Sequence, residues 1–353
     1  MPWKACNTMS LRQEFVELAR QEGANRRELC RRFGISSPTA YKWIKRFEEQ
    51  GCEGLVDRSR RPLSSPAISS PEIEAAVIAV RTEHPAWGAR KISWRLQHLG
   101  GPSVAPSTVT SILHRHGLVT PEASEAATPW KRFEREEPNA LWQADFKGHF
   151  QTFEGRCSPL TMLDDHSRFS LCLQACEGER LELVKPHLID VFRQYGLPLR
   201  ITADNGPPWG SNIAGGLSTL EVWLMRLGVE VSHSRPYHPQ TQGKLERFHQ
   251  TLKREVLHRA FSDLQHCQRV MSQWRDEYNH YRPHEALDQR PPIERYRPSP
   301  RSYPEQLPTI EYEPGDHVVK VRRTGQVYFK GLNVFVSGGL YGEQVAIRPT
   351  AED

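Results

Sequence analysis

The amino-acid sequence predicts a multidomain protein with all-α units at its N-terminus, a central α/β core and a small β-barrel at its C-terminus. Three observations carry this prediction. The chain has 353 residues, which is long enough for two or three domains. Apolar residues first repeat at helical spacing and later in alternating strands interleaved with helices. Aperiodic stretches rich in Pro, Ser or Glu separate these regions.

The composition shifts place the domain boundaries. We expect two helical units, two linkers around the second unit, an α/β core, a third linker and a terminal barrel. The ranges are, in order, 1–56, 57–70, 71–119, 120–138, 139–297, 298–314 and 315–353.

The composition also excludes several classes of protein. Only 37% of the residues are hydrophobic, and no run of about 20 apolar residues is present, so we expect no membrane span. The first ten residues lack the apolar core of a signal peptide, which predicts a cytoplasmic protein. The seven cysteines are scattered without a C-x-x-C pair, which argues against a disulfide framework or a zinc ribbon.

The net charge of +5 is concentrated in the N-terminal third. Residues 1–70 contain 13 Lys and Arg against 8 Asp and Glu, whereas the charges after residue 140 balance. A basic segment of this kind points to a polyanionic partner.

The first 50 residues have the pattern of a helix-turn-helix. Helices are expected from about Ser10 to Gly23, over Arg26–Phe33 and from Pro38 to about Gln50, with Gly34 in the turn and a serine as the N-cap of the last helix. The last helix would enter the major groove of DNA. A three-helix bundle with a solvated basic face is the alternative. The residues expected to contact DNA are Ser37, Thr39, Tyr41, Lys42, Lys45 and Arg46.

A basic linker and a second helical unit follow. Arg58, Arg60 and Arg61 are candidates for a minor-groove arm, although a merely solvated linker would look the same. Three further helices are expected over Pro71–Glu83, Ala89–Leu99 and Ser107–His116, which predicts a second helix-turn-helix or winged-helix-like domain.

The region after residue 139 alternates strands and helices in the order β-β-β-α-β-α-β-α, which is the ribonuclease H topology. This order predicts a ribonuclease H-like core with a mixed five-stranded sheet. The expected strands are 141–146, 160–164, 169–174, 199–204 and 229–232, and the expected helices are 181–195, 217–227 and 242–260.

Three carboxylates stand where this topology brings elements together. Asp145 and Asp204 end two strands that this topology would place side by side, and Glu246 is expected on the helix that packs against that sheet edge. Breaking or joining a phosphodiester is catalysed by two Mg²⁺ ions held by carboxylates. The rival acids Asp164 and Asp165 are interpreted as parts of a turn.

These residues stand in motifs that resemble the DDE transposases of bacterial insertion sequences, whose core is similar to retroviral integrase. The resemblance covers residues 139–297. The motifs are Trp142-Gln143-Ala144-Asp145, Asp204-Asn205-Gly206, the segment RPYHPQTQGKLERF from Arg235 to Phe248, and Tyr278-Asn279 with Tyr281-Arg282-Pro283-His284.

The resemblance implies an activity and its partners. It implies cleavage of element ends and strand transfer with two Mg²⁺ ions, for which Mn²⁺ would substitute. It also implies that Asp145 bridges both ions while Asp204 and Glu246 each hold one. It also implies double-stranded DNA as partner (element ends and target), a homo-oligomer (dimer or tetramer) on that DNA, and a bacterial, nucleoid-associated location.

One departure from the family pattern lies between the second and third acids. Between Asp204 and Glu246 stand 41 residues, which is more than usual in the family. The surplus around Ser211–Ser218 is expected to be a surface insertion that leaves the carboxylates converging.

Polar residues near the acids are further candidates for DNA contact. Asn205, Lys244, Arg247 and Lys253 would meet phosphates and position the DNA rather than specify its sequence. A solvated helix surface is the alternative for each charge. In the C-terminal barrel, the candidates for contact with DNA or a second subunit are Lys320, Arg322, Arg323 and Lys330, and a purely structural role is the alternative.

Two other function classes compete with a transposase. A DNA-binding regulator with an inert core would need the helical units but not the three acids. A nuclease for RNA hybrids or junctions would need the core but not the two helical units.

Overall fold

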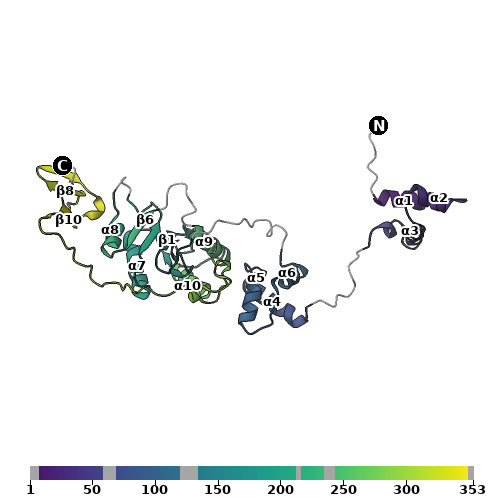
Figure 1. Ribbon diagram of the computed structural model, residues 1–353, viewed down its shortest axis with the longest axis horizontal. Helices are drawn as coiled ribbons and strands as arrows, with labels where there is room; N and C mark the ends of the chain where they lie inside the picture. Colours follow the sequence, from purple (N-terminus) through teal and green to yellow (C-terminus); the bar gives the residue numbers. More distant parts are fainter. Residues whose placement is uncertain (1–7, 59–68, 120–133, 212–215, 234–242, 349–353) are drawn as a thin grey trace. The chain divides into compact units, whose positions relative to one another are not determined.

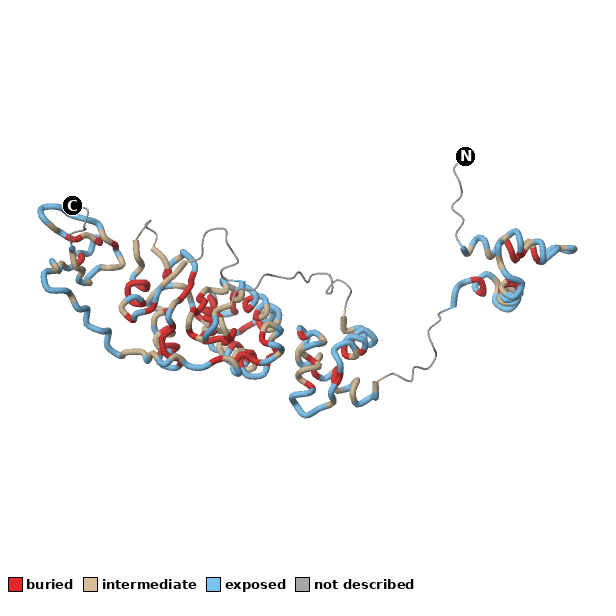
Figure 2. Tube along the Cα trace, viewed as in Figure 1, coloured by how far each residue is buried: buried red, intermediate tan, exposed pale blue. Residues whose placement is uncertain are grey.

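The computed structural model describes residues 8–58, 69–119, 134–211, 216–233 and 243–348, drawn in colour in Figure 1. The chain divides into two compact units, one up to Ile68 and one from Ser69 onward. Figure 2 shows that buried residues gather inside each group of helices and around the sheet. No helix in the described ranges has the length and apolar character needed to span a bilayer.

The first unit is the predicted three-helix arrangement. It consists of α1 (Thr8–Ala19), α2 (Arg26–Arg32), α3 (Ser37–Gln50) and the short 3₁₀ helix η1 (Gly51–Leu55). Ser36 caps α3 by accepting the Thr39 amide, so this helix begins one residue earlier than predicted. The core comprises Phe15, Val16, Ala19, Cys30, Ala40, Trp43, Ile44 and Leu55.

Three helices also follow residue 70, as expected. They are α4 (Pro71–Glu83), α5 (Ala89–His98) and α6 (Pro106–Arg115). Trp87, Ile92 and Val109 are fully buried among them, so the apolar stripes predicted from sequence do form a common core.

The α/β core has the predicted ribonuclease H-like mixed sheet. Its strands are β1 (Trp142–Phe146), β2 (Phe150–Gln151), β3 (Arg156–Asp164), β4 (Ser170–Cys176), β5 (Arg200–Ala203) and β6 (Glu230–His233). The order is β2-β3-β1-β5-β6, with β4 paired to β3. β1, β3 and β4 are antiparallel, whereas β1, β5 and β6 are parallel. The two-residue β2, which makes the sheet six-stranded, was not predicted.

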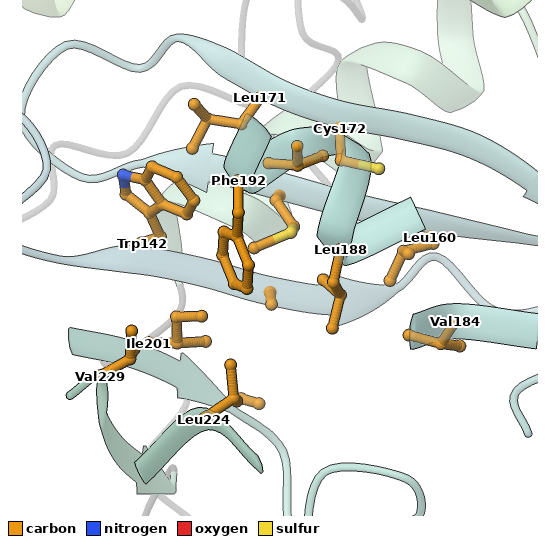
Figure 3. Packing of buried hydrophobic residues seen from close by; sticks show 14 of the residues in the cluster. Trp142, Leu160, Leu171, Cys172, Val184, Leu188, Phe192, Ile201, Leu224 and Val229 are labelled. Atoms are coloured by element: carbon orange, nitrogen blue, oxygen red, sulfur yellow. The ribbon is translucent and has the colours of Figure 1, made fainter. Parts of the chain in front are cut away.

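Four helices cover the sheet: α7 (Leu181–Tyr195), α8 (Thr219–Arg226), α9 (Gly243–Glu255) and α10 (Leu264–His280). On one face, α7 and α8 pack on Trp142 and Ala144 of β1; Figure 3 shows Phe192 of α7 beside Trp142, with ring centroids 6.0 Å apart. A second cluster joins α9 and α10 to β3 and β4. Because side chains alternate along a strand, Gln143 and Asp145 face away from α7.

The C-terminal region differs from the predicted barrel. Its strands, β7 (His317–Lys320), β8 (Gln326–Phe329), β9 (Leu332–Phe335) and β10 (Gln344–Ile347), form two separate two-stranded sheets, β10–β7 and β8–β9. Val321 and Val327 are the buried apolar residues of the described part of this region. Two such side chains are too few to fill the interior of a closed barrel.

Candidate active site

The pairing of β1 with β5 brings two of the predicted acids to neighbouring positions. The two strands are parallel, with Trp142 opposite Ile201 and Gln143 opposite Thr202. Asp145 and Asp204 each lie two residues beyond this last pair, at the carboxyl ends of adjacent strands. Ligand sites of open α/β sheets form at this edge.

Burial and nearby charge alter the ionisation of both carboxyl groups. Burial, followed by the negative charge of Asp204, raises the pKa of Asp145 to about 6. The Phe146 amide donates to Asp145 Oδ1 at 2.8 Å and opposes the rise. Partial burial also raises the pKa of Asp204, although the Gly206 amide donates to its Oδ1 at 3.3 Å. Neither carboxylate has a Lys or Arg ion-pair partner within the described ranges.

Glu246 lies on the first turn of α9, directly after residues 234–242, which are outside the described residues. Its side chain is exposed. Among the residues that the structure describes, no three His, Cys, Asp or Glu side chains are close enough to hold a metal ion. The structure thus brings Asp145 and Asp204 together, but it does not bring Glu246 into a ligand cluster with them.

The donor set at the strand ends fits a hard divalent cation. Carboxylate oxygens are the ligands that Mg²⁺ prefers, and the ion commonly takes only one or two of them from the protein. Burial, and after it the charge of Asp204, disfavours the ionised form of Asp145, and a bound cation would favour that form. Asp145 and Asp204 are therefore suitable magnesium ligands, and Glu246 stands on the adjacent helix.

The rival acids Asp164 and Asp165 are engaged in the fold, as the turn interpretation predicts. Asp164 accepts the backbone amides of Asn139 and Ser167 at 2.7 and 2.8 Å. Asp165 is 1% exposed and accepts Gln143 Nε2 at 2.9 Å.

The predicted DNA-binding residues of the first unit lie on and beside α3. Ser37, Tyr41, Lys42 and Lys45 are exposed, whereas Thr39 and Arg46 are half-buried. Lys42 and Arg46 both lie over the ring of Trp43, and Arg58 donates to Gln50 Oε1 at 2.9 Å. Arg60 and Arg61 lie outside the described residues.

The predicted contacts near the acids divide into two groups. Asn205, Arg247 and Lys253 are exposed and remain accessible to DNA. The ammonium group of Lys244 instead lies 2.5 Å from Asp165 Oδ2, and its side chain is only 16% exposed. This protein partner gives Lys244 a role within the fold, and its predicted phosphate contact stays a prediction.

Several polar residues beside the acids were missed by sequence reasoning. His233 Nδ1 lies 2.8 Å from the carbonyl oxygen of Asp204, and its Nε2 lies 2.8 Å from Glu221 Oε1. Thr161 stands opposite Asp145 in the β1–β3 ladder and contacts His249. Among the polar residues near the acids, Gln143 could have been identified from the sequence, since it stands within the motif that ends in Asp145.

Comparison with known protein families agrees with this architecture. Two models described as integrase core domain match residues 135–239 and 227–292. A helix-turn-helix domain matches residues 11–62, and a homeodomain-like domain matches residues 39–113.

The similar proteins include products of bacterial insertion elements. An uncharacterized 31.7 kDa protein of insertion element IS407 from Burkholderia multivorans is 26% identical over 70% of this chain and 89% of its own length. An uncharacterized 39.2 kDa protein of IS476 from Xanthomonas euvesicatoria is 24% identical over 70% of this chain and 71% of its own. The Gag-Pro-Pol polyprotein of Simian retrovirus SRV-2 is 34% identical, over 33% of this chain and 6% of the polyprotein.

Solved structures with some likeness include a simian T-cell lymphotropic virus intasome in complex with PP2A regulatory subunit B56 gamma. Its matched chain is 19% identical, with a TM-score of 0.40 over 73% of this chain and 85% of its own. The HTLV-2 integrase catalytic core domain in complex with magnesium is 15% identical, with a TM-score of 0.34 over 46% of this chain and 99% of its own. The chain is thus similar to integrase core domains and helix-turn-helix domains, and to proteins of bacterial insertion elements.

Proposed function

We propose that the protein is a DNA transposase that binds the terminal inverted repeats of its element, cleaves the element ends and transfers each 3′-OH into target DNA. The observation that carries the proposal is the pair of Asp145 and Asp204 on adjacent parallel strands of an integrase core. Two helix-turn-helix regions precede that core, which favours recognition of specific DNA.

The reaction consists of two in-line displacements at phosphorus. In the first, a water oxygen attacks the phosphorus at the element end, and the bond to the 3′ oxygen breaks to leave a free 3′-OH. In the second, that 3′ oxygen attacks a target phosphorus and displaces a target 3′ oxygen. The second step exchanges one phosphodiester for another, so it needs no further energy source.

The acids of this chain would hold the metal ions for both steps. Asp145 would contact both ions, Asp204 and Glu246 would each hold one, and Mn²⁺ would substitute for Mg²⁺. When bound, the ions stabilise negative charge on the attacking and leaving oxygens. Because the exposed side chain of Glu246 lies outside a ligand cluster, we expect that side chain to turn toward Asp145 when metal and DNA bind, while α9 itself keeps its place.

The remaining roles follow from exposure and charge. Exposed α3 residues would contact the element end, and Asn205, Arg247 and Lys253 would position phosphates beside the acids. Two ends must be joined together, so we expect a dimer or tetramer on DNA. The protein would act on the nucleoid in the bacterial cytoplasm.

Strand transfer of a pre-cut end tests the proposal. Footprinting on the DNA that flanks the gene defines the end duplex, which is then incubated with target plasmid and Mg²⁺ or Mn²⁺. Asp145→Asn, Asp204→Asn and Glu246→Gln should each abolish joining and leave end binding intact, whereas Asp190→Asn on the exposed surface of α7 should join normally.

The competing functions give different results in the same assay. Specific end binding without joining by the wild-type protein would identify a regulator. Cleavage of RNA–DNA hybrids without joining would identify a nuclease.

A further inference from the structure

Helix α9 carries Glu246, and its position must be defined relative to Asp145 if the two acids serve one reaction. The apolar side of the helix, formed by Leu245, Phe248 and Leu252, packs in the cluster with β3, β4 and α10. Apolar packing has little directional preference, so by itself it specifies the rotation and axial position of a helix only loosely. Hydrogen bonds from buried polar groups specify both.

The first such contact joins the start of α9 to β1. Gln143 is 2% exposed, and its Oε1 accepts the backbone amide of Leu245 at 3.2 Å. Its Nε2 donates to Asp165 Oδ1 at 2.9 Å, and Asp165 Oδ2 pairs with Lys244 Nζ at 2.5 Å. Both amide atoms of Gln143 are therefore used. The two residues that precede Glu246 are connected to this side chain, Leu245 directly and Lys244 through Asp165.

The second contact joins the middle of α9 to the residue opposite Asp145. Thr161 pairs with Asp145 in the β1–β3 ladder, and its hydroxyl donates to the Asp145 carbonyl oxygen at 2.8 Å. A hydroxyl has one proton, so Thr161 Oγ1 must accept from His249 Nε2, which lies 2.7 Å away.

His249 is suited to act as a permanent donor in this contact. It follows Glu246 by three residues, which places both on neighbouring positions of the helix surface. The side chain is 8% exposed, and burial lowers its pKa to about 3. The ring is therefore neutral near pH 7, with its proton on Nε2.

We propose that Gln143, Thr161 and His249 are positioning residues that hold α9, and with it Glu246, at a defined place relative to Asp145. This role rests on the proposed transposase function. None of the three needs to touch metal or DNA, because each acts through the placement of a carboxylate.

Hydrogen exchange of the metal-free, full-length protein tests the contact itself. Thr161→Val removes the hydroxyl but keeps the shape, and we expect backbone exchange in α9 to rise about tenfold. Ser158→Ala is the matched control: Ser158 lies on the same strand, is fully buried, and its hydroxyl has no hydrogen-bond partner among the described residues. Backbone hydrogen exchange in α9 of Ser158→Ala should match that of the wild type.

Nicking of supercoiled plasmid with Mn²⁺ tests the consequence for the reaction. Thr161→Val and His249→Leu should lower the maximal rate at saturating Mn²⁺ about tenfold or more, with little change in DNA affinity. His249→Gln places an amide donor near the position of Nε2 and should recover most of the rate. The double variant Thr161→Val/His249→Leu should nick only slightly more slowly than either single variant, because both substitutions remove the same contact.

The outcomes separate this role from the proposed function. If α9 exchange and nicking in Thr161→Val equal those of Ser158→Ala, the positioning role is wrong while the transposase proposal stands. If Asp145→Asn nicks as fast as the wild type, the proposed function is wrong and the role falls with it. A His249→Gln variant as slow as His249→Leu, although folded to the same melting temperature, would also overturn the role.

Discussion

Replacing Asp145 by Asn should stabilise the metal-free protein at neutral and alkaline pH. The folded-state pKa of Asp145 is about 6, against an ordinary value of 3.8, because burial and the charge of Asp204 disfavour its ionised form. The unfolded chain therefore loses this proton more readily than the folded one. Ionisation of Asp145 consequently destabilises the fold. The loss of folding free energy grows as the pH rises from about 4 to 6 and stays constant at higher pH.

The expected size follows from the two pKa values. Each tenfold difference in proton affinity corresponds to 1.36 kcal/mol, so the cost is about 3 kcal/mol at pH 8 and about 1 kcal/mol at pH 4.5. Asn keeps the acceptor oxygen for the Phe146 amide and lacks the charge. For a domain of this size, we expect the melting temperature of the core to rise by about 6–12 °C at pH 8 in EDTA.

Scanning calorimetry at the two pH values measures the effect, with Asp190→Asn as the control for a surface carboxylate. Added Mg²⁺ should reverse the order at pH 8, because it stabilises the wild type through Asp145 and leaves the variant unchanged. The reasoning is refuted if, at pH 8 without metal, the melting temperature of Asp145→Asn is equal to or lower than that of the wild type. It is also refuted if the increase in melting temperature is the same at both pH values.

Further predictions concern the two helical units. Lys42→Gln and Lys45→Gln should each reduce the slope of log affinity against log salt concentration by about 0.9 if the residue neutralises a phosphate, as measured by anisotropy with an end duplex. Gly54→Ala should destabilise the first unit by about 1–3 kcal/mol, since a Cβ there would meet the Arg46 carbonyl, as urea unfolding of the full chain would reveal. Gly88→Ala has open space and should be nearly neutral by the same measurement.

Much of the fold was predictable because periodicity and turn residues act locally. The helix predicted over Leu181–Tyr195 has those ends in the structure, and the order of strands and helices in the core was correct. The C-terminal barrel is not confirmed: the short alternating runs near Val321 and Val327 do form strands, but these strands form two small sheets with few buried apolar residues. Alternation indicates strands but does not establish that their sheets close.

The candidate site was predictable to the extent that its residues share a motif or a strand end. Asp145 and Asp204 could be paired in advance because parallel strands share their carboxyl edge, and the β1–β5 register supports this. Glu246 was expected to converge with them and does not form a ligand cluster in the described structure. The distance from Glu246 on its helix to the two strand-end acids depends on how that helix packs on the sheet. The number of residues between the acids in the sequence does not specify this packing.

Residue patterns alone were enough to identify the basic N-terminal region, the integrase-like motifs and the candidate acids, and to predict the domain order. Those patterns did not reveal that Lys244 pairs with Asp165, or that Thr161 joins His249 to the strand of Asp145; the folded structure shows both contacts. The physical reason is that helix and strand periodicities specify which side of an element is buried. Which polar atoms meet on that side depends on the register and rotation of elements far apart in the chain.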